Sequence, residues 1–156
     1  TVDGDTSTND TVLAFAAGPP LAQEHHAVLE QGLTQAMQQL ARAIARDGEG
    51  ATCMIEVQVE GALDEAAALQ VARTVCGSSL VKTAVHGRDP NWGRIVAPAG
   101  RSGVSFDPDA VALWIGPHQL MAAGQPVAFD RAAASDVLRQ DHVPIRLCLK
   151  VASRCS

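Results

Sequence analysis

Apolar residues recur at steps of three and four between residues 21 and 46, and this spacing predicts one long amphipathic helix. The positions are Leu29, Leu33, Met37, Leu40 and Ile44. A helix over this range would be about 39 Å long at about 1.5 Å per residue. Before it, the apolar block Val12 to Ala17 stands between a polar run and Gly18-Pro19-Pro20. That order predicts a capped, short buried helix followed by a stop.

After residue 49 the pattern changes from a helical period to a period of two. Residues 55–60 alternate apolar and polar side chains, which predicts a strand with one solvated face. Asp64 predicts the cap of a helix that runs to Gly77, and Ser78 or Ser79 the cap of another that runs to Gly87.

The second half of the chain mixes turn residues with short apolar runs. Residues 88–103 predict a structured loop with one helical turn, because glycine and proline are frequent there. Strands are expected near 110–115 and 143–151, with a helix over 131–139 between them. Pro144 predicts that the last strand lies at a sheet edge. Together these elements predict one α/β domain over residues 1–156, with long helices on one face of a mixed sheet.

Composition narrows the function classes without choosing one. The 156 residues are 47% hydrophobic with a formal net charge of -5, and the arginines are dispersed, so a nucleic-acid partner is not expected. No apolar run approaches the roughly 20 residues of a membrane helix, and no secretory signal stands at the start. The four cysteines lack Cys-x-x-Cys spacing, which favours a reducing cytoplasm.

The polar run from Asp3 to Asp10 is the first candidate for chemistry. It can form a turn that caps a helix, with Asp10 near the positive helix end. The run from Val2 to Thr6, with Asp3 and Asp5, also resembles the Asp-x-Asp-x-Thr signature of haloacid-dehalogenase-type phosphohydrolases, which bind Mg²⁺ and attack phosphorus with an aspartate. This interpretation requires a hydrophobic strand before the aspartates and a second Mg²⁺-binding segment, and the sequence shows neither.

The second candidate is the turn-rich segment from His86 to Ile95. Its composition is typical of a rigid loop beside a site, with Asp89, Asn91 and Arg94 as pocket-loop candidates. The alternative is a packed turn in which Trp92 is the buried plug and Asp89 bonds nearby amides. No metal site is expected elsewhere, because His25 and His26 lack zinc-ligand spacing.

These two segments together resemble the ornithine acetyltransferase (ArgJ) family. The matching motifs read VDGDTSTNDTV from residue 2 and SLVKTAVHGRDPNWGRI from residue 79, and the resemblance runs to about residue 149. It implies an ArgJ-type fold and a precursor that cleaves itself before a threonine. The freed threonine would take the acetyl group of N2-acetylornithine and pass it to glutamate, as an acyl-enzyme. Some members also accept acetyl from acetyl-CoA; no bound cofactor is implied.

The resemblance assigns this chain to the interior of the second (beta) chain, paired with the alpha chain of the same precursor as a heterotetramer. Thr1 precedes Val-Asp-Gly-Asp, an interior setting, so the nucleophile is expected outside this chain. Glu49 matches the family's substrate-contacting Glu in its Glu-Gly-x-Thr setting; without the resemblance it would be a solvated loop residue. The tail from Lys150 departs from the family pattern and has no counterpart of its substrate-binding Asn, which leaves a non-catalytic remnant as the alternative.

Overall fold

The structure is a computed structural model that describes residues 2, 4–5 and 7–149. Two of the sequence candidates, Thr1 and Asp3, lie outside these described residues. The chain divides into two compact units, Val2–Glu49 and a second unit that begins at Gly50. The expectation of a single domain over residues 1–156 stays a prediction. Among the described residues, no helix has the length and apolar character that crossing a bilayer requires.

The first unit is built around the long helix that the apolar period predicts. A short 3-10 turn, η1 (Gln23–His25), leads into α1 (His26–Arg46), so the predicted helix is confirmed. Asp47 ends it by donating its backbone N–H to the carbonyl of Ala43 at 2.9 Å. None of the residues of α1 is buried. The apolar stripe therefore exists as predicted, but its side chains remain accessible.

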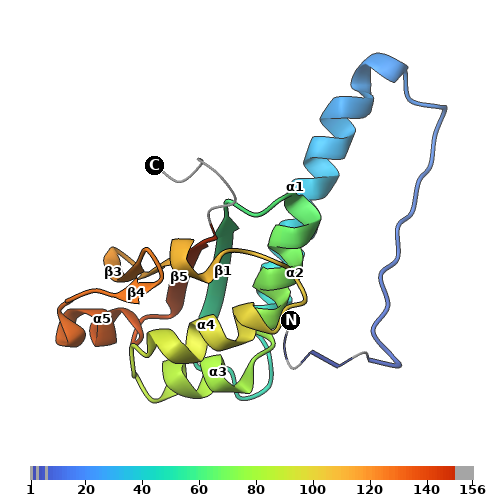
Figure 1. Cartoon of the computed structure of the whole chain (residues 1–156). Coiled ribbons are helices and arrows are strands. Elements are labelled where there is room, and N and C mark those ends of the chain that lie inside the picture. The colour runs from blue at the N-terminus through green and yellow to red at the C-terminus, as the bar shows by residue number, and fades with distance from the viewer. Residues whose placement is uncertain (1, 3, 6, 150–156) are drawn as a thin grey trace. The chain divides into compact units, whose positions relative to one another are not determined.

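The expected short helix over Val12 to Ala17 is wrong. Residues 11–17 contain no regular secondary structure, and Figure 1 shows this segment as a plain trace. Phe15 is 92% exposed, so the block is not buried either. Helix nucleation is unfavourable, and a block this short cannot offset it without a surface to pack on.

The second unit contains one five-stranded mixed sheet in the order β1-β5-β2-β3-β4. The strands are β1 (Met54–Glu60), β2 (Ala112–Ile115), β3 (His118–Ala122), β4 (Gln125–Pro126) and β5 (His142–Cys148). β5 pairs in parallel with β1 and antiparallel with β2. Figure 1 shows β1 and β5 as neighbouring strands with helices beside them. The predicted mixed sheet is confirmed, and β3 and β4 are strands that the sequence analysis missed.

Helices cover one face of this sheet. They are α2 (Glu65–Cys76), α3 (Ser79–His86), α4 (Trp92–Gly100) and α5 (Arg131–Val137), with a 3-10 turn η2 (Pro108–Ala110) before β2. The core joins Val71 and Val75 of α2 and Ile95 of α4 to Ile145 and Leu147 of β5. The α/β fold class with helices on a mixed sheet is thereby confirmed.

Two local predictions need correction. The 88–103 region holds a nine-residue helix, α4, because Asn91 accepts a hydrogen bond from the backbone N–H of Arg94 and caps its first turn. Pro144 does not lie at a sheet edge, since β5 pairs on both sides. Its carbonyl accepts from Gly116, just past the end of β2, so the missing proline N–H falls where the β2 ladder has already ended.

The sheet core gives a direct test of the fold. Leu147 is fully buried, whereas Leu63 is 78% exposed. Leu147→Ala is expected to lower the free energy of unfolding by about 2 to 5 kcal/mol, because it leaves a cavity between β5 and the helices. The matched control Leu63→Ala is expected to change it by less than about 0.5 kcal/mol. Urea denaturation followed by circular dichroism measures both, and equal losses would contradict the assigned core.

Candidate functional site

The candidate loop begins where α3 ends in a specific backbone turn. The N–H of Asp89 donates to the carbonyl of Ala84 at 2.9 Å, and the N–H of Arg88 donates to Val85 at 3.0 Å. This pair of bonds is the Schellman motif, which places the last but one of its six residues in the left-handed conformation. Here that residue is Arg88, with φ of 55°. Glycine is favoured at such a position, so the backbone of Arg88 is held against its own preference.

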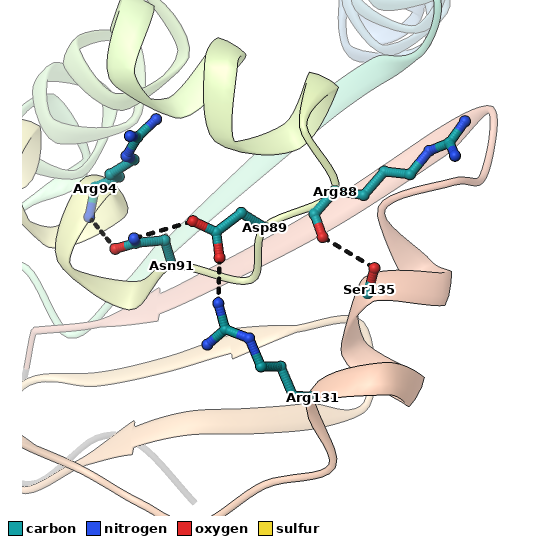
Figure 2. A network of polar contacts seen from close by, with 6 residues as sticks. All are labelled: Arg88, Asp89, Asn91, Arg94, Arg131 and Ser135. Carbon is teal, nitrogen blue, oxygen red and sulfur yellow. Dashed lines mark hydrogen bonds and ion pairs between the residues drawn. The ribbon is translucent and has the colours of Figure 1, made fainter.

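Asp89 bridges two other parts of the loop region through both of its carboxylate oxygens. Oδ1 accepts from Arg131 Nη2 at 2.5 Å, and Oδ2 accepts from Asn91 Nδ2 at 3.1 Å (Figure 2). The Asp89 side chain is 33% exposed and that of Arg131 is 68% exposed. An ion pair this accessible contributes on the order of 0 to 1 kcal/mol. Its main effect is therefore to fix the direction of the loop.

A second contact from α5 holds the same loop. Ser135 Oγ donates to the carbonyl of Arg88 at 2.9 Å. α5 itself begins at Asp130, whose carboxylate accepts from the N–H groups of Ala132 and Ala133. Figure 2 shows Arg131 and Ser135 reaching the loop from this one helix. Arg88 is thus held both by the turn that ends α3 and by the contact from α5. A strained backbone conformation persists where the surrounding structure restrains it in this way.

Arg94 and Trp92 differ from the roles that composition suggested. Arg94 Nη1 donates to Thr83 Oγ1 at 3.2 Å, which ties α4 to α3. Trp92 is 37% exposed and is not the buried plug of the loop; Ile95, 2% exposed, fills the core instead. Trp92 is the first residue of α4, and the buried residues of this helix, Ile95, Pro98 and Ala99, all follow it.

The loop candidates therefore divide by what their side chains contact. Asp89, Asn91 and Arg94 all bond to neighbouring protein groups, so they shape the loop. The guanidinium of Arg88 is exposed and has no polar partner among the described residues. In chemical terms the loop presents an exposed cation, and guanidinium groups favour anionic ligands.

Several residues that build this site gave no usable signal in the sequence. Arg131 and Ser135 lie more than 40 positions from the loop residues they bond. Only the fold brings α5 next to the end of α3. The one local signal was Asp130, a cap residue followed by Arg131 and alanines. It indicates where α5 begins but not which residues α5 contacts.

Glu49 belongs to the other unit and is described there alone. It lies two residues beyond Asp47, the end of α1, between Gly48 and Gly50, and its side chain is exposed. Gly50 has φ of 72°, which allows the chain to turn directly after Glu49. No group of three or more His, Cys, Asp or Glu side chains that could hold a metal occurs among the described residues.

Fold and loop together define a class: an α/β protein with a one-sided mixed sheet and a clamped loop after α3. Comparison with known proteins gives the family. The model of the ArgJ family matches residues 1–155. The Arginine biosynthesis bifunctional protein ArgJ of Parasynechococcus marenigrum is 78% identical over 149 residues, covering 96% of this chain and 36% of that protein. The protein of the same name from Prochlorococcus marinus is 71% identical over 140 residues, covering 90% of this chain and 33% of that protein.

A solved structure agrees with the sequence matches. The crystal structure of the arginine biosynthesis bifunctional protein argJ from Bacillus halodurans has a TM-score of 0.91 and 41% identity, covering 98% of this chain and 75% of that one. The chain therefore belongs to the ArgJ family. It spans about a third of the length of the curated relatives it matches.

The strained residue of the loop yields a stability prediction. Because φ at Arg88 is in the left-handed region, Arg88→Gly is expected to be more stable than Arg88→Ala by about 1 kcal/mol. Both variants remove the same guanidinium, so the difference isolates the backbone. Thermal and urea unfolding measure it, and an Ala variant as stable as the Gly variant would show that the backbone there is relaxed.

Proposed function

We propose that this chain is part of an enzyme that transfers the acetyl group of N2-acetylornithine to glutamate in arginine biosynthesis. The observation that carries the proposal is the 78% identity over 149 residues to a relative whose name is Arginine biosynthesis bifunctional protein ArgJ. Acetyl-CoA is proposed as a second acetyl donor, since "bifunctional" in that name fits two acetyl sources. No bound cofactor is part of the proposal.

The proposed mechanism uses two covalent half-reactions. A threonine outside this chain attacks the acetyl carbonyl, ornithine leaves, and the acyl-threonine then passes its acetyl group to the amine of glutamate. The amino terminus of that threonine serves as the base, and hydrogen-bond donors from a partner chain stabilise the oxyanion. The partner is the alpha chain of the same precursor, in a heterotetramer, and the compartment is the cytoplasm. Thr1 is not the proposed nucleophile.

Glu49 is the residue of this chain proposed to contact substrate. N2-acetylornithine carries a free side-chain ammonium, and an exposed carboxylate is a direct partner for it. Glu49 also follows the end of α1, where the carbonyl groups give the helix terminus partial negative charge. A cation near this point relieves the repulsion between that charge and the carboxylate. Both effects favour binding of the ammonium form of the substrate.

The loop of Asp89, Asn91 and Arg94 is proposed to lie beside the substrate pocket. Its side chains support that role by holding one another and α5 in place, rather than by pointing free groups at substrate. The alternative function was a Mg²⁺-dependent phosphohydrolase that uses Asp3 and Asp5. Membership of the ArgJ family leaves this alternative without support. The remaining alternative is a folded, non-catalytic remnant of the subunit, which an activity measurement separates from the transferase.

A chimera tests the transferase. The segment of the Parasynechococcus marenigrum relative that matches this chain is replaced by this chain, and acetyl transfer from acetylornithine to glutamate is measured by mass spectrometry. Transfer is expected in the chimera and is not expected from the 156-residue chain alone. The trapped acetyl adduct should map to a threonine outside these residues. A folded but inactive chimera would support the remnant, and acetylated Thr1 would contradict the assignment of the nucleophile.

Replacing Glu49 in the active chimera tests the substrate contact. Glu49→Gln keeps the size of the side chain and removes its charge, so kcat/KM for acetylornithine is expected to fall by a factor that corresponds to about 1.5 to 3 kcal/mol. Glu24→Gln, at another exposed carboxylate of the same unit, is the control and should leave kcat/KM unchanged. An unchanged value for Glu49→Gln would return Glu49 to a solvated loop residue.

A further inference from the structure

A hollow of about 290 Å³ lies on the sheet face opposite the helices of the second unit, lined by β1, β5 and β2 with the turn that follows it. The register of the strands explains it. Pro144 pairs with Glu56 on one side, and its carbonyl accepts the N–H of Gly116 on the other. Proline and glycine carry no long side chain, so this row of the sheet is low. The next row is tall, because Arg146 and Trp114 stand there in register.

Arg146 forms one wall of the hollow and keeps its donors available. Its guanidinium lies 4.1 Å from the centre of the Trp114 ring, and Nη1 lies 3.9 Å from Glu60 Oε2. The second distance is longer than a hydrogen bond. Among the described residues, the guanidinium therefore has a ring partner and a loose ion pair but no hydrogen-bond acceptor. Its paired N–H groups match a carboxylate in two parallel hydrogen bonds, so this wall suits the carboxylate of a ligand.

Glu56 supplies the opposite charge beside the low row. Its Oε2 lies 3.0 Å from His142 Nε2, and its side chain is 45% exposed. A carboxylate has about four lone-pair sites, so its bonds within the protein leave capacity for the ammonium group of a ligand. The carboxylates of Glu56 and Glu60 outnumber the one guanidinium around the hollow. This balance favours a ligand with a net positive charge.

The spacing of Arg146 and Glu56 sets the length of the ligand. Arg146 is in register with Gln58, two residues beyond Glu56 on β1. Strands lie about 4.8 Å apart and two residues span about 6.6 Å, so the two backbone positions are roughly 8 Å apart. An α-ammonium is only two bonds from its carboxylate carbon. A cation at the end of a four-carbon side chain is six bonds away, which is roughly 7 Å when extended.

We propose that this hollow binds a free α-amino acid whose side chain ends in a cation. The α-carboxylate pairs with Arg146, the side-chain cation pairs with Glu56, and the methylene groups lie over Pro144. The hollow is at the lower end of the roughly 300 to 1,000 Å³ of ligand pockets, which suits one amino acid rather than a nucleotide or a peptide. The inference goes beyond acetyl transfer and does not depend on it, because the residues proposed for that reaction do not line the hollow.

Calorimetric titration of the chimera with L-lysine and three analogues tests the ligand class. L-lysine is expected to bind saturably, with one molecule per chain. Cadaverine lacks the carboxylate, L-norleucine lacks the side-chain ammonium, and L-2,3-diaminopropionate is too short to reach both charged groups. Each analogue is therefore expected to bind at least about 10-fold more weakly. The absence of saturable L-lysine binding, or equal affinities across the series, overturns the proposal.

Matched variants of the chimera locate the site. Arg146→Met removes the guanidinium and Glu56→Gln removes the carboxylate charge, so each is expected to weaken L-lysine binding at least about 10-fold. Arg139→Met and Glu65→Gln remove the same charges at exposed positions outside the hollow and are expected to change the affinity less than about twofold. Equal losses in both pairs would indicate a general charge effect and contradict the site. The ligand series decides the matter without any variant that fails to fold.

Glu49→Gln separates this site from the proposed substrate contact. It is expected to leave L-lysine binding unchanged while it lowers kcat/KM for acetylornithine. If Glu49→Gln abolishes L-lysine binding and Arg146→Met does not, lysine binds at the substrate contact and the proposal falls. A chimera that binds L-lysine through Arg146 but transfers no acetyl group would keep this site and remove the proposed function.

Discussion

Strand β5 is the constraint on which the second unit depends. Its inward side chains Val143, Ile145 and Leu147 are between 0% and 1% exposed, and each lies in register with an apolar residue of β1. On its other side β5 pairs with β2, so Ile145 stands between Val57 and Ile115. These cross-strand rows form the continuous apolar face that the helices cover. Without β5, the parallel strand β1 and the antiparallel strands β2 to β4 would have no shared ladder.

The opposite face of the same strands is polar, which explains why one layer of helices suffices. The guanidinium of Arg146 lies 4.1 Å from the centre of the Trp114 ring, and His142 Nε2 lies 3.0 Å from Glu56 Oε2. Such pairs on an accessible sheet face contribute little stability each. They make the face compatible with water, so the alternation along β1 and β5 directs the helices α2 to α5 of this unit to the other side.

The position of the candidate loop follows from this core. α5 leads into β5, and its residues Arg131 and Ser135 hold Asp89 and Arg88. Arg88 keeps its left-handed backbone conformation because the turn that ends α3 and the two contacts from α5 all require the same backbone path. The loop is thus rigid for a structural reason, whatever ligand it faces. Among the described residues of the first unit no comparable core forms, because α1 buries none of its residues.

The sequence alone determined the periodic elements and the family. The stripe of α1, the alternation of β1 and the cap at Asp64 are local signals, and all three elements form where they predict. The two long motifs indicated the family because their order and residue types recur together. Tertiary structure decided the rest. Pro144 lies inside the sheet because β2 ends beside it, and Val12 to Ala17 form no helix because a short apolar block adopts the conformation its surroundings can pair. Asp89 depends on Arg131, 42 positions away, and no local pattern encodes a contact that only the placement of α5 beside the loop after α3 creates.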